Sequence, residues 1–294
     1  MSTMKSLKVI GIGEVVWDCL PEGKKLGGAP VNFSYFCKEL GADAYPVTAI
    51  GSDQLADETM TELKLTGLDL SLISRNELPT SRVLVELNEE GVPQYTIVEN
   101  VAWDAMEATP AALKLMSDAD VVCWGSLAQR TPKSRDAVLA LVDAVPDTAL
   151  KVFDINIRKP FFDKETIVAS LEKANVLKLN EDELPLLIDM LSLPAGNDEA
   201  IAALIKQYSL KYLLFTQGAV CSGIYDASGE ISTLPTPKVK VADTVGAGDS
   251  FTAAFVTSLL KGASVTEAHR KAVDVAAYVC TQSGVIHPIP DNLR

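Results

Sequence analysis

The sequence predicts an α/β fold in which helices cover both faces of a mostly parallel sheet, with a small β-sheet lid added. Short apolar segments alternate with amphipathic segments along most of the 294 residues, which is typical of strands connected by helices. The alternation is interrupted where two β segments, at residues 82–88 and 94–98, flank Glu89-Glu90-Gly91 with no helix between them. Because we find no internal repeat and no low-complexity linker, we expect residues 1–294 to form one domain with a lid built from about residues 14–26 and 75–103.

The first 70 residues predict two strands and two helices. Pro30 suits the first turn of a helix, whereas Gly41 and Gly67 suit helix ends. The elements are expected, in order, as a strand at 7–12, a helix at 30–40, a strand at 44–50 and a helix at 54–66.

Beyond residue 104 the alternation of strands and helices resumes and continues to the C-terminal region. Strands are expected at 120–125, 150–154, 176–179 and 212–216, with intervening helices that include 134–145 and 165–174. A β pair is expected at 222–225 and 231–234 around Ser228-Gly229, followed by helices at 247–261 and 266–280.

The composition excludes several classes of protein. A net charge of −13 argues against a nucleic-acid partner, which would require a basic face. No apolar run reaches the roughly 18 residues that span a bilayer, and the N-terminal segment does not resemble a secretory signal. We therefore expect a cytoplasmic protein with no membrane partner.

Cysteine and histidine usage gives little support for metal or hydrolase chemistry. The five cysteines are far apart and form no Cys-x-x-Cys pair, and we interpret them as small buried side chains. The two histidines, His269 and His287, have no partner at metal-ligand spacing, and His269 is expected on a solvated helix face. The Gly-x-Ser-x-Gly turn of serine hydrolases is absent.

A dinucleotide-binding site is also disfavoured. The first strand ends in Gly11-Ile12-Gly13, but Val16 stands where the third glycine of Gly-x-Gly-x-x-Gly would be. The chain also lacks the Gly-x4-Gly-Lys-Ser/Thr phosphate loop.

Residues 26–32 read Leu-Gly-Gly-Ala-Pro-Val-Asn and predict a ligand-binding helix start. The two glycines allow the backbone to approach a ligand, and Asn32 on the first turn offers both a donor and acceptors for hydroxyl groups. Asp18 could accept two neighbouring hydroxyls from the other side. The alternative is a flexible surface loop followed by an ordinary helix start.

Residues 243–251, Asp-Thr-Val-Gly-Ala-Gly-Asp-Ser-Phe, open an apolar helix and give the strongest signal. Free amides at a glycine-containing helix start, together with the helix dipole, form an anion hole that suits a phosphoryl group in transfer. Asp249 in the first turn could remove the proton from an attacking hydroxyl. The alternative is that Asp249 only caps the helix.

Two further polar segments follow buried strands. Asn180 and Glu183 lie three residues apart at a helix start and offer oxygen atoms to a hydrated magnesium ion, although an acidic helix N-terminus would look the same. Arg158, after the strand at 150–154, is a fixed cation that can meet a phosphate. Ligands bind at the carboxyl ends of the strands in an open parallel sheet, so these segments are expected to converge.

Three of these segments resemble the signatures of the ribokinase-like (PfkB) carbohydrate kinases. The run at 27–32 resembles the N-terminal signature, 243–249 the C-terminal signature, and 180–183 the Asn-x-x-Glu metal motif. The resemblance covers about residues 8–289, and residues 13–30 are most similar to fructokinases within the family.

The resemblance implies an ATP-dependent kinase that phosphorylates a sugar primary hydroxyl, in fructokinases the 6-hydroxyl of fructose. It implies that Asp249 is the base and that the anion hole is supplied by Gly246, Ala247 and Gly248. It further implies that the sugar is held by Asp18, Gly28 and Asn32, with Arg158 near the phosphoryl group or the far end of the sugar.

For the cofactors, the resemblance implies ATP with Mg²⁺ and a monovalent cation, usually K⁺. The nucleotide is expected at Asn180, Thr216, Gly218, Ser283 and Gly284. Glu183 matches the magnesium motif, whereas Asp243 and the carbonyl of Val245 match the monovalent-cation site.

Two departures from the family pattern lie on the substrate side. The run Val98-Glu99-Asn100-Val101-Ala102-Trp103 replaces the Tyr-Arg-Pro-Ala-Asp-like run of many bacterial fructokinases, and Ala56 ends a Gly-x-Asp-x-x-Gly motif. The acceptor therefore stays open between fructose, another ketose, ribose, a keto-deoxy sugar acid and a nucleoside, and a non-catalytic sugar or nucleotide sensor remains an alternative. An unpaired edge of the lid sheet predicts a homodimer formed through the lid.

Overall fold

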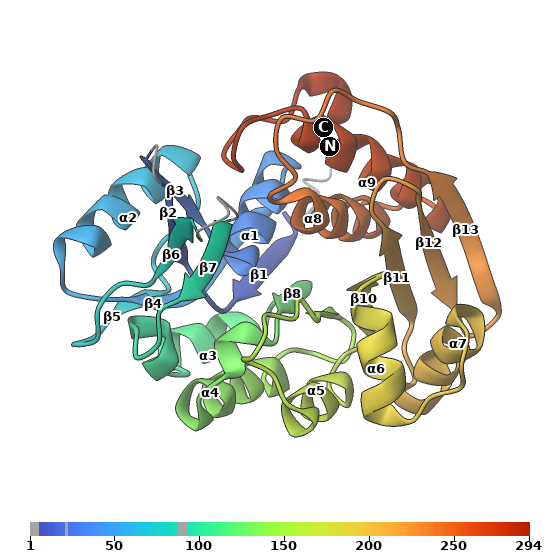
Figure 1. Ribbon diagram of the computed structural model, residues 1–294, viewed down its shortest axis with the longest axis horizontal. Coiled ribbons are helices and arrows are strands. Elements are labelled where there is room, and N and C mark those ends of the chain that lie inside the picture. Colours follow the sequence, from blue (N-terminus) through green and yellow to red (C-terminus); the bar gives the residue numbers. More distant parts are fainter. Residues whose placement is uncertain (1–5, 21–22, 88–92) are drawn as a thin grey trace.

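The computed structural model describes residues 6–20, 23–87 and 93–294, and its main feature is a nine-stranded sheet (Figure 1). The strand order is β13-β12-β11-β10-β9-β8-β1-β4-β5. In this order, the strands from β11 through β10, β9, β8, β1 and β4 to β5 pair in parallel, and β12 and β13 extend the β11 edge as antiparallel strands. The strands are β1 (Lys8–Ile12), β4 (Asp43–Ile50), β5 (Ile73–Arg75), β8 (Val121–Trp124), β9 (Leu150–Asp154), β10 (Val176–Asn180), β11 (Tyr212–Gln217), β12 (Cys221–Asp226) and β13 (Gly229–Pro235). The predicted α/β class is confirmed.

Helices cover both faces of this sheet, and each interface is an apolar core (Figure 1). One face carries α1 (Ala29–Glu39), α8 (Ala247–Leu260) and α9 (Val265–Cys280). The other carries α3 (Pro110–Met116), α4 (Pro132–Asp143), α5 (Lys164–Leu171), α6 (Glu183–Leu191) and α7 (Asn197–Tyr208). Short helical turns lie at η1 (Ala102–Ala105), η2 (Leu127–Gln129) and η3 (Asp291–Leu293). The central strands β1, β8, β9 and β10 are covered on both faces, so nearly all of their residues are buried rather than every second one.

A second sheet, the lid sheet, lies in the left part of the view in Figure 1, near α2. Its order is β3-β2-β6-β7, formed by β2 (Val16–Leu20), β3 (Gly23–Gly27), β6 (Arg82–Leu87) and β7 (Pro93–Ile97). Within the segments predicted for the lid, residues 14–26 and 75–103, Arg75 instead ends β5 of the main sheet, and residues 101–103 are buried in the body of the protein. The predicted turn at Glu89-Glu90-Gly91 lies outside the described residues.

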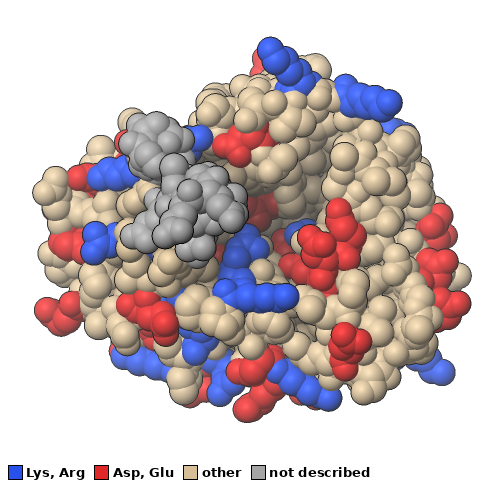
Figure 2. Space-filling view, viewed as in Figure 1, with Lys and Arg blue, Asp and Glu red and all other residues tan. Residues whose placement is uncertain are grey.

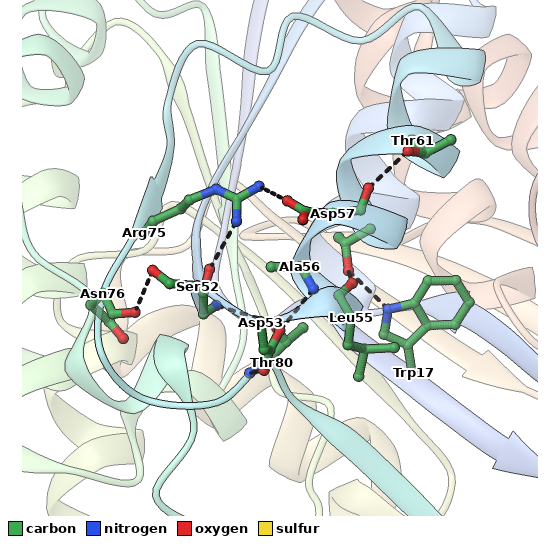
Figure 3. Close-up of polar contacts among 12 residues, drawn as sticks. Trp17, Ser52, Asp53, Leu55, Ala56, Asp57, Thr61, Arg75, Asn76 and Thr80 are labelled. Carbon is green, nitrogen blue, oxygen red and sulfur yellow. Dashed lines mark hydrogen bonds and ion pairs between the residues drawn. The ribbon is translucent and has the colours of Figure 1, made fainter.

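The lid sheet joins the body at the start of α2 (Gln54–Thr66), shown in Figure 3. Asp53 caps this helix by accepting the amide N–H of Ala56 at 2.8 Å. The same carboxylate accepts the N–H and the hydroxyl of Thr80, at 2.9 and 2.7 Å. Trp17 on β2 donates its ring N–H to the hydroxyl of Thr59 at 2.8 Å. The hydrogen bonds of Asp53 therefore hold Thr80, just before β6, against the start of α2.

The expectation that His269 lies on a solvated helix face is wrong. The residue faces β12 and β13, and its ring nitrogens lie 2.8 Å from the hydroxyls of both Ser222 and Ser232. Burial lowers the pKa of His269 to about 4, so the ring is neutral near pH 7. The flanking Glu267 and Arg270 are the exposed residues of this turn, so the polar run misled the interpretation.

Candidate active site

A cleft of about 870 Å³ opens between the lid sheet and the carboxyl ends of the parallel strands. The lid sheet contributes Val16, Asp18, Val83 and Ile97 to its lining. Figure 2 shows a hollow near the centre of this face, with both basic and acidic side chains around it. The run at 98–103, which departs from the family pattern, contributes no residue to the lining of the cleft. Its residues Val101, Ala102 and Trp103 are packed in the interior.

The N-terminus of α8 points into this cleft and has no side-chain cap. Gly246 precedes the helix with a φ of 79°, a left-handed conformation that glycine adopts without strain. The N–H of Ala247 is already used, because it donates to the carbonyl of Thr244 at 3.2 Å. Helix geometry leaves the N–H groups of Gly248 and Asp249 without an intrahelical acceptor. An anion placed here would meet two backbone donors and the positive end of the helix dipole.

Asp249 lies in the first turn of α8 and lines the cleft. Its Oδ2 accepts a hydrogen bond from the side-chain amide of Asn32 at 2.8 Å, which joins the first turns of α1 and α8. Burial, and next the nearby charge of Asp154, raise the pKa of Asp249 to about 6. A carboxyl with this pKa is ionised at neutral pH and is basic enough to accept a proton.

The predicted sugar-side residues meet around the start of α1. Gly28 has a φ of 120°, and a Cβ there would lie 2.4 Å from the carbonyl oxygen of Glu14, so only glycine fits. Asp18 is partly buried on β2, and burial raises its pKa. Arg158 is exposed and lines the cleft, and its charge lowers the pKa of both Asp18 and Asp249. All four predicted sugar-side residues line this cleft: Asp18, Gly28, Asn32 and Arg158.

Glu14 is a further acid of the cleft that the sequence did not reveal. It follows β1, is only 3% exposed, and its Oε2 has no hydrogen-bond partner among the described residues. Burial raises the pKa of Glu14 to about 7, although hydrogen bonds from its own N–H and that of Ala29 oppose the shift. The signal available in the sequence was a lone acid directly after a buried strand that ends in glycine.

A buried ion pair lies beneath the N-terminus of α8. Lys178 of β10 contacts Asp154 of β9 at 3.0 Å, with both side chains less than 10% exposed. A Cβ on Gly248 would lie 3.1 Å from the Lys178 ammonium, so this cation sits directly beneath the α8 N-terminus. The signal in the sequence was a lysine in the otherwise apolar strand Val176–Asn180. A lysine buried at such a position needs a partner of opposite charge, here on the neighbouring strand.

The Asn180–Glu183 pair forms a closed local arrangement rather than an open metal cluster. The side-chain carbonyl of Asn180 accepts the N–H groups of Asp182 and Glu183, at 2.9 and 3.0 Å. The two carboxylate oxygens of Glu183 accept the N–H groups of Ile157 and Asn180, at 2.9 and 2.8 Å. Glu183 is buried, and Asn180, Glu181 and Asp182 line the cleft in its place. Magnesium binding by Glu183 stays a prediction.

The nucleotide-side residues divide between the cleft and an adjoining loop. Thr216 and Gly218, at the end of β11, line the cleft together with Val245. Ser283 and Gly284 do not line it, and they lie beside Asp243, whose Oδ2 accepts the N–H of Gly284 at 3.2 Å. The sequence therefore located the loop that follows α9, but not its position relative to the cleft.

The described residues contain no ready-made metal centre and no membrane-crossing helix. Among them, no three His, Cys, Asp or Glu side chains gather as a set of metal ligands. Within the same ranges, no helix has both the length and the apolar character that crossing a bilayer requires.

Comparison with known proteins gives consistent results along nearly the whole chain. The family described as pfkB family carbohydrate kinase matches residues 13–292. A fructokinase of Escherichia coli is 30% identical over 315 residues, covering 97% of both chains. The crystal structure of a fructokinase with bound ATP from Xylella fastidiosa has a TM-score of 0.85 at 21% identity, covering 96% of this chain and 95% of that one. A putative ribokinase II from E. coli in complex with ATP and Mg²⁺ has a TM-score of 0.82 at 22% identity, covering 98% and 96%.

Proposed function

The chain belongs to the pfkB family of carbohydrate kinases, and we propose that it transfers the γ-phosphoryl group of ATP to the 6-hydroxyl of D-fructose. The observation that carries this proposal is the meeting of Asp249, Asn32 and the uncapped N-terminus of α8 in one cleft. A base, a polar sugar-binding group and an anion hole are the parts that phosphoryl transfer to an alcohol requires.

In the proposed reaction, Asp249 removes the proton of the sugar hydroxyl as its oxygen attacks the γ-phosphorus. The new P–O bond forms while the bond to the β-phosphate oxygen breaks, and the electron pair leaves with ADP. The free N–H groups of Gly248 and Asp249 at the start of α8 meet the charge on the phosphoryl oxygens. Loss of one such donor typically costs about 2.7–4 kcal/mol of transition-state stabilisation.

The sugar would be held on the lid side of the cleft. Asp18 and Asn32 offer hydrogen bonds to its hydroxyls, Gly28 allows close approach of the backbone, and Arg158 contacts the phosphoryl group or the far end of the sugar. The lid sheet would exclude water, which otherwise competes with the sugar as the phosphoryl acceptor.

ATP would lie on the opposite side of the cleft, along Asn180, Thr216 and Gly218 and toward the loop at 283–284. The exposed carboxylates of Glu181 and Asp182 suit a hydrated Mg²⁺ that keeps its waters, with Glu183 holding the loop in place. Bound Mg²⁺ would neutralise phosphate charge in a chain that carries a net charge of −13.

A sugar panel with ATP tests the function. ADP release is measured with fructose, other ketoses, ribose, a keto-deoxy sugar acid and nucleosides, and fructose is expected to give the highest kcat/KM. A higher value for another acceptor would reassign the substrate. If sugar binds but no acceptor supports ADP release above the level of the Asp249→Asn variant, the protein is a sensor and the proposed reaction is wrong.

We also propose that two copies pair through the lid. Strands β3 and β7 form the edges of the lid sheet, and an unpaired edge offers backbone groups to a second strand. Light scattering after size-exclusion chromatography would give the mass of a dimer, twice the 31.5 kDa of the chain. A monomeric mass at micromolar concentration would contradict the pairing.

A further inference from the structure

A lysine of the lid sheet reaches the loops that frame the anion hole. Lys25 on β3 places its ammonium 3.5 Å from Oδ2 of Asp243 and 3.4 Å from the hydroxyl of Ser283. Its aliphatic stem runs past Gly284, where a Cβ would lie 3.9 Å from Cδ of the lysine. Lys25 therefore connects the lid to residues more than 200 positions later in the chain.

Asp243 ties together the loop before α8 and the loop after α9. Its Oδ1 accepts the N–H of Val245 at 3.1 Å, and its Oδ2 accepts the N–H of Gly284 at 3.2 Å. Partial burial would raise the pKa of Asp243, but these two hydrogen bonds and the charge of Lys25 lower it below its usual value. The carboxylate is thus a fixed negative charge three residues before Gly246.

This geometry fits poorly with a free metal cation at Asp243. Both carboxylate oxygens already accept hydrogen bonds, and the positive charge that the site needs is already present on Lys25. A second positive ion beside the same carboxylate would repel the ammonium, because the two charges would lie within a few ångströms of each other.

We propose that the ammonium of Lys25 takes the place of the monovalent cation at Asp243, so that the lid sheet supplies the charge that orders the anion hole. This inference rests on the proposed kinase function only for its consequence in turnover. Docking of β3 then brings the sugar-side wall and the countercharge of Asp243 into place in one step. The enzyme needs no K⁺ for this purpose.

The neighbouring lysine provides a matched control. Successive side chains of a strand point to opposite faces, and Lys24 accordingly turns away from Asp243. Lys24 pairs with Glu58 of α2 and lies 4.9 Å over the ring of Trp17. Lys24→Met therefore removes the same charge from the same strand without touching the loops at 243–245 and 283–284.

The experiment compares wild type, Lys25→Met and Lys24→Met in KCl and in choline chloride at equal ionic strength. We expect wild type and Lys24→Met to keep ADP release within about twofold when choline replaces K⁺. Lys25→Met is expected to lose about tenfold or more in choline and to recover at least fivefold in KCl. Melting temperatures identify any variant that fails to fold.

Binding of Tl⁺, a K⁺ mimic, supplies a readout that does not depend on turnover. In crystals soaked with Tl⁺, an anomalous peak beside Asp243 is expected in Lys25→Met and not in wild type or Lys24→Met. A peak in wild type, wild-type activity that needs K⁺, or a Lys25→Met variant that neither binds Tl⁺ nor responds to K⁺ would each overturn the inference. If wild type phosphorylates no sugar, the proposed function fails, while the Tl⁺ result still decides the role of Lys25.

Discussion

The side-chain amide of Asn32 donates a hydrogen bond to the Asp249 carboxylate across 2.8 Å and so joins residues that lie 217 positions apart in the sequence. The two residues occupy the first turns of α1 and α8, which pack on the same face of the main sheet. A small shift of either helix would therefore move the proposed base relative to the proposed sugar site.

Replacing Asp249 by asparagine separates catalysis from stability. We expect Asp249→Asn to lower kcat by about 10²–10⁴-fold, because a general base contributes that much, with much smaller changes in the dissociation constants of sugar and ATP. The matched control is Asp198→Asn, an exposed aspartate in the first turn of α7. Wild-type kcat in Asp249→Asn would remove Asp249 from its proposed role.

The same variant should be more stable than wild type at neutral pH. The folded pKa of Asp249, about 6, lies above its ordinary value of 3.8, so the folded state binds more protons and loses stability as pH rises between these values. The ionised carboxylate then costs at most about 3 kcal/mol at pH 7. We expect Asp249→Asn to melt a few degrees higher at pH 7.5 and to show no gain at pH 3.5.

The fall of kcat/KM at acid pH should reflect protonation of Asp249, and the Asn32→Ala substitution should shift it. Because the base must be ionised, kcat/KM is expected to fall about tenfold per pH unit below a pKa of about 6. The hydrogen bond from Asn32 lowers the pKa of Asp249, so Asn32→Ala should move this limb to higher pH. An unchanged limb in Asn32→Ala would show that another group titrates.

Alanine substitutions at two glycines in left-handed conformations distinguish the effect of backbone strain from an effect on catalysis. Gly246 has a φ of 79°, and a Cβ added there would lie 3.2 Å from the side chain of Val285. Gly262, after the other end of α8, has a φ of 95°, and a Cβ there would meet open space. Alanine at either position should cost about 1–2 kcal/mol of unfolding free energy. Only Gly246→Ala is expected to lower kcat, by about 10²-fold, because it displaces the amides of the anion hole. Equal kcat in the two variants would contradict the anion hole.

Removing one partner of the buried ion pair beneath Gly248 should lower stability strongly, whereas replacing both partners by apolar residues should lower it little. Lys178→Met leaves Asp154 as an uncompensated buried charge and is expected to lower the free energy of unfolding by about 3–5 kcal/mol. The double variant Lys178→Met/Asp154→Leu should regain most of this loss, as urea unfolding would measure. No recovery in the double variant would mean that Lys178 stabilises the fold through other contacts.

Asp53 is expected to position the lid sheet as well as to cap α2. Asp53→Ala loses the bonds to Ala56 and Thr80, and we expect a stability loss of about 1–2 kcal/mol together with a raised KM for the sugar. Asp163→Ala removes an equivalent cap from α5, on the other face of the sheet, and should lower stability alone. Equal effects on KM would exclude a role for Asp53 in placing the lid.

The sequence predicted the α/β class, the lid strands and a set of polar residues because each signal is local. Glycines before an apolar helix are visible in a window of ten residues, and they pointed to Asp249 and to Gly28. Glu14 and Lys178 were missed because burial of a charge depends on neighbouring strands that the chain pattern does not reveal. His269 was misplaced for the same reason, since its partners Ser222 and Ser232 lie on other elements. Strand β5 was missed because three residues are too few to show alternation.

The face of the sheet that holds α1, α8 and α9 has a consequence for how the protein is made. Helix α1 is synthesised early, but α8 and α9, which pack on the same face, are synthesised more than 200 residues later. Until then, Phe33, Phe36 and the strands beneath them lack their final cover. A nascent chain halted before residue 247 would expose this surface, which makes it a natural target for chaperones and proteases.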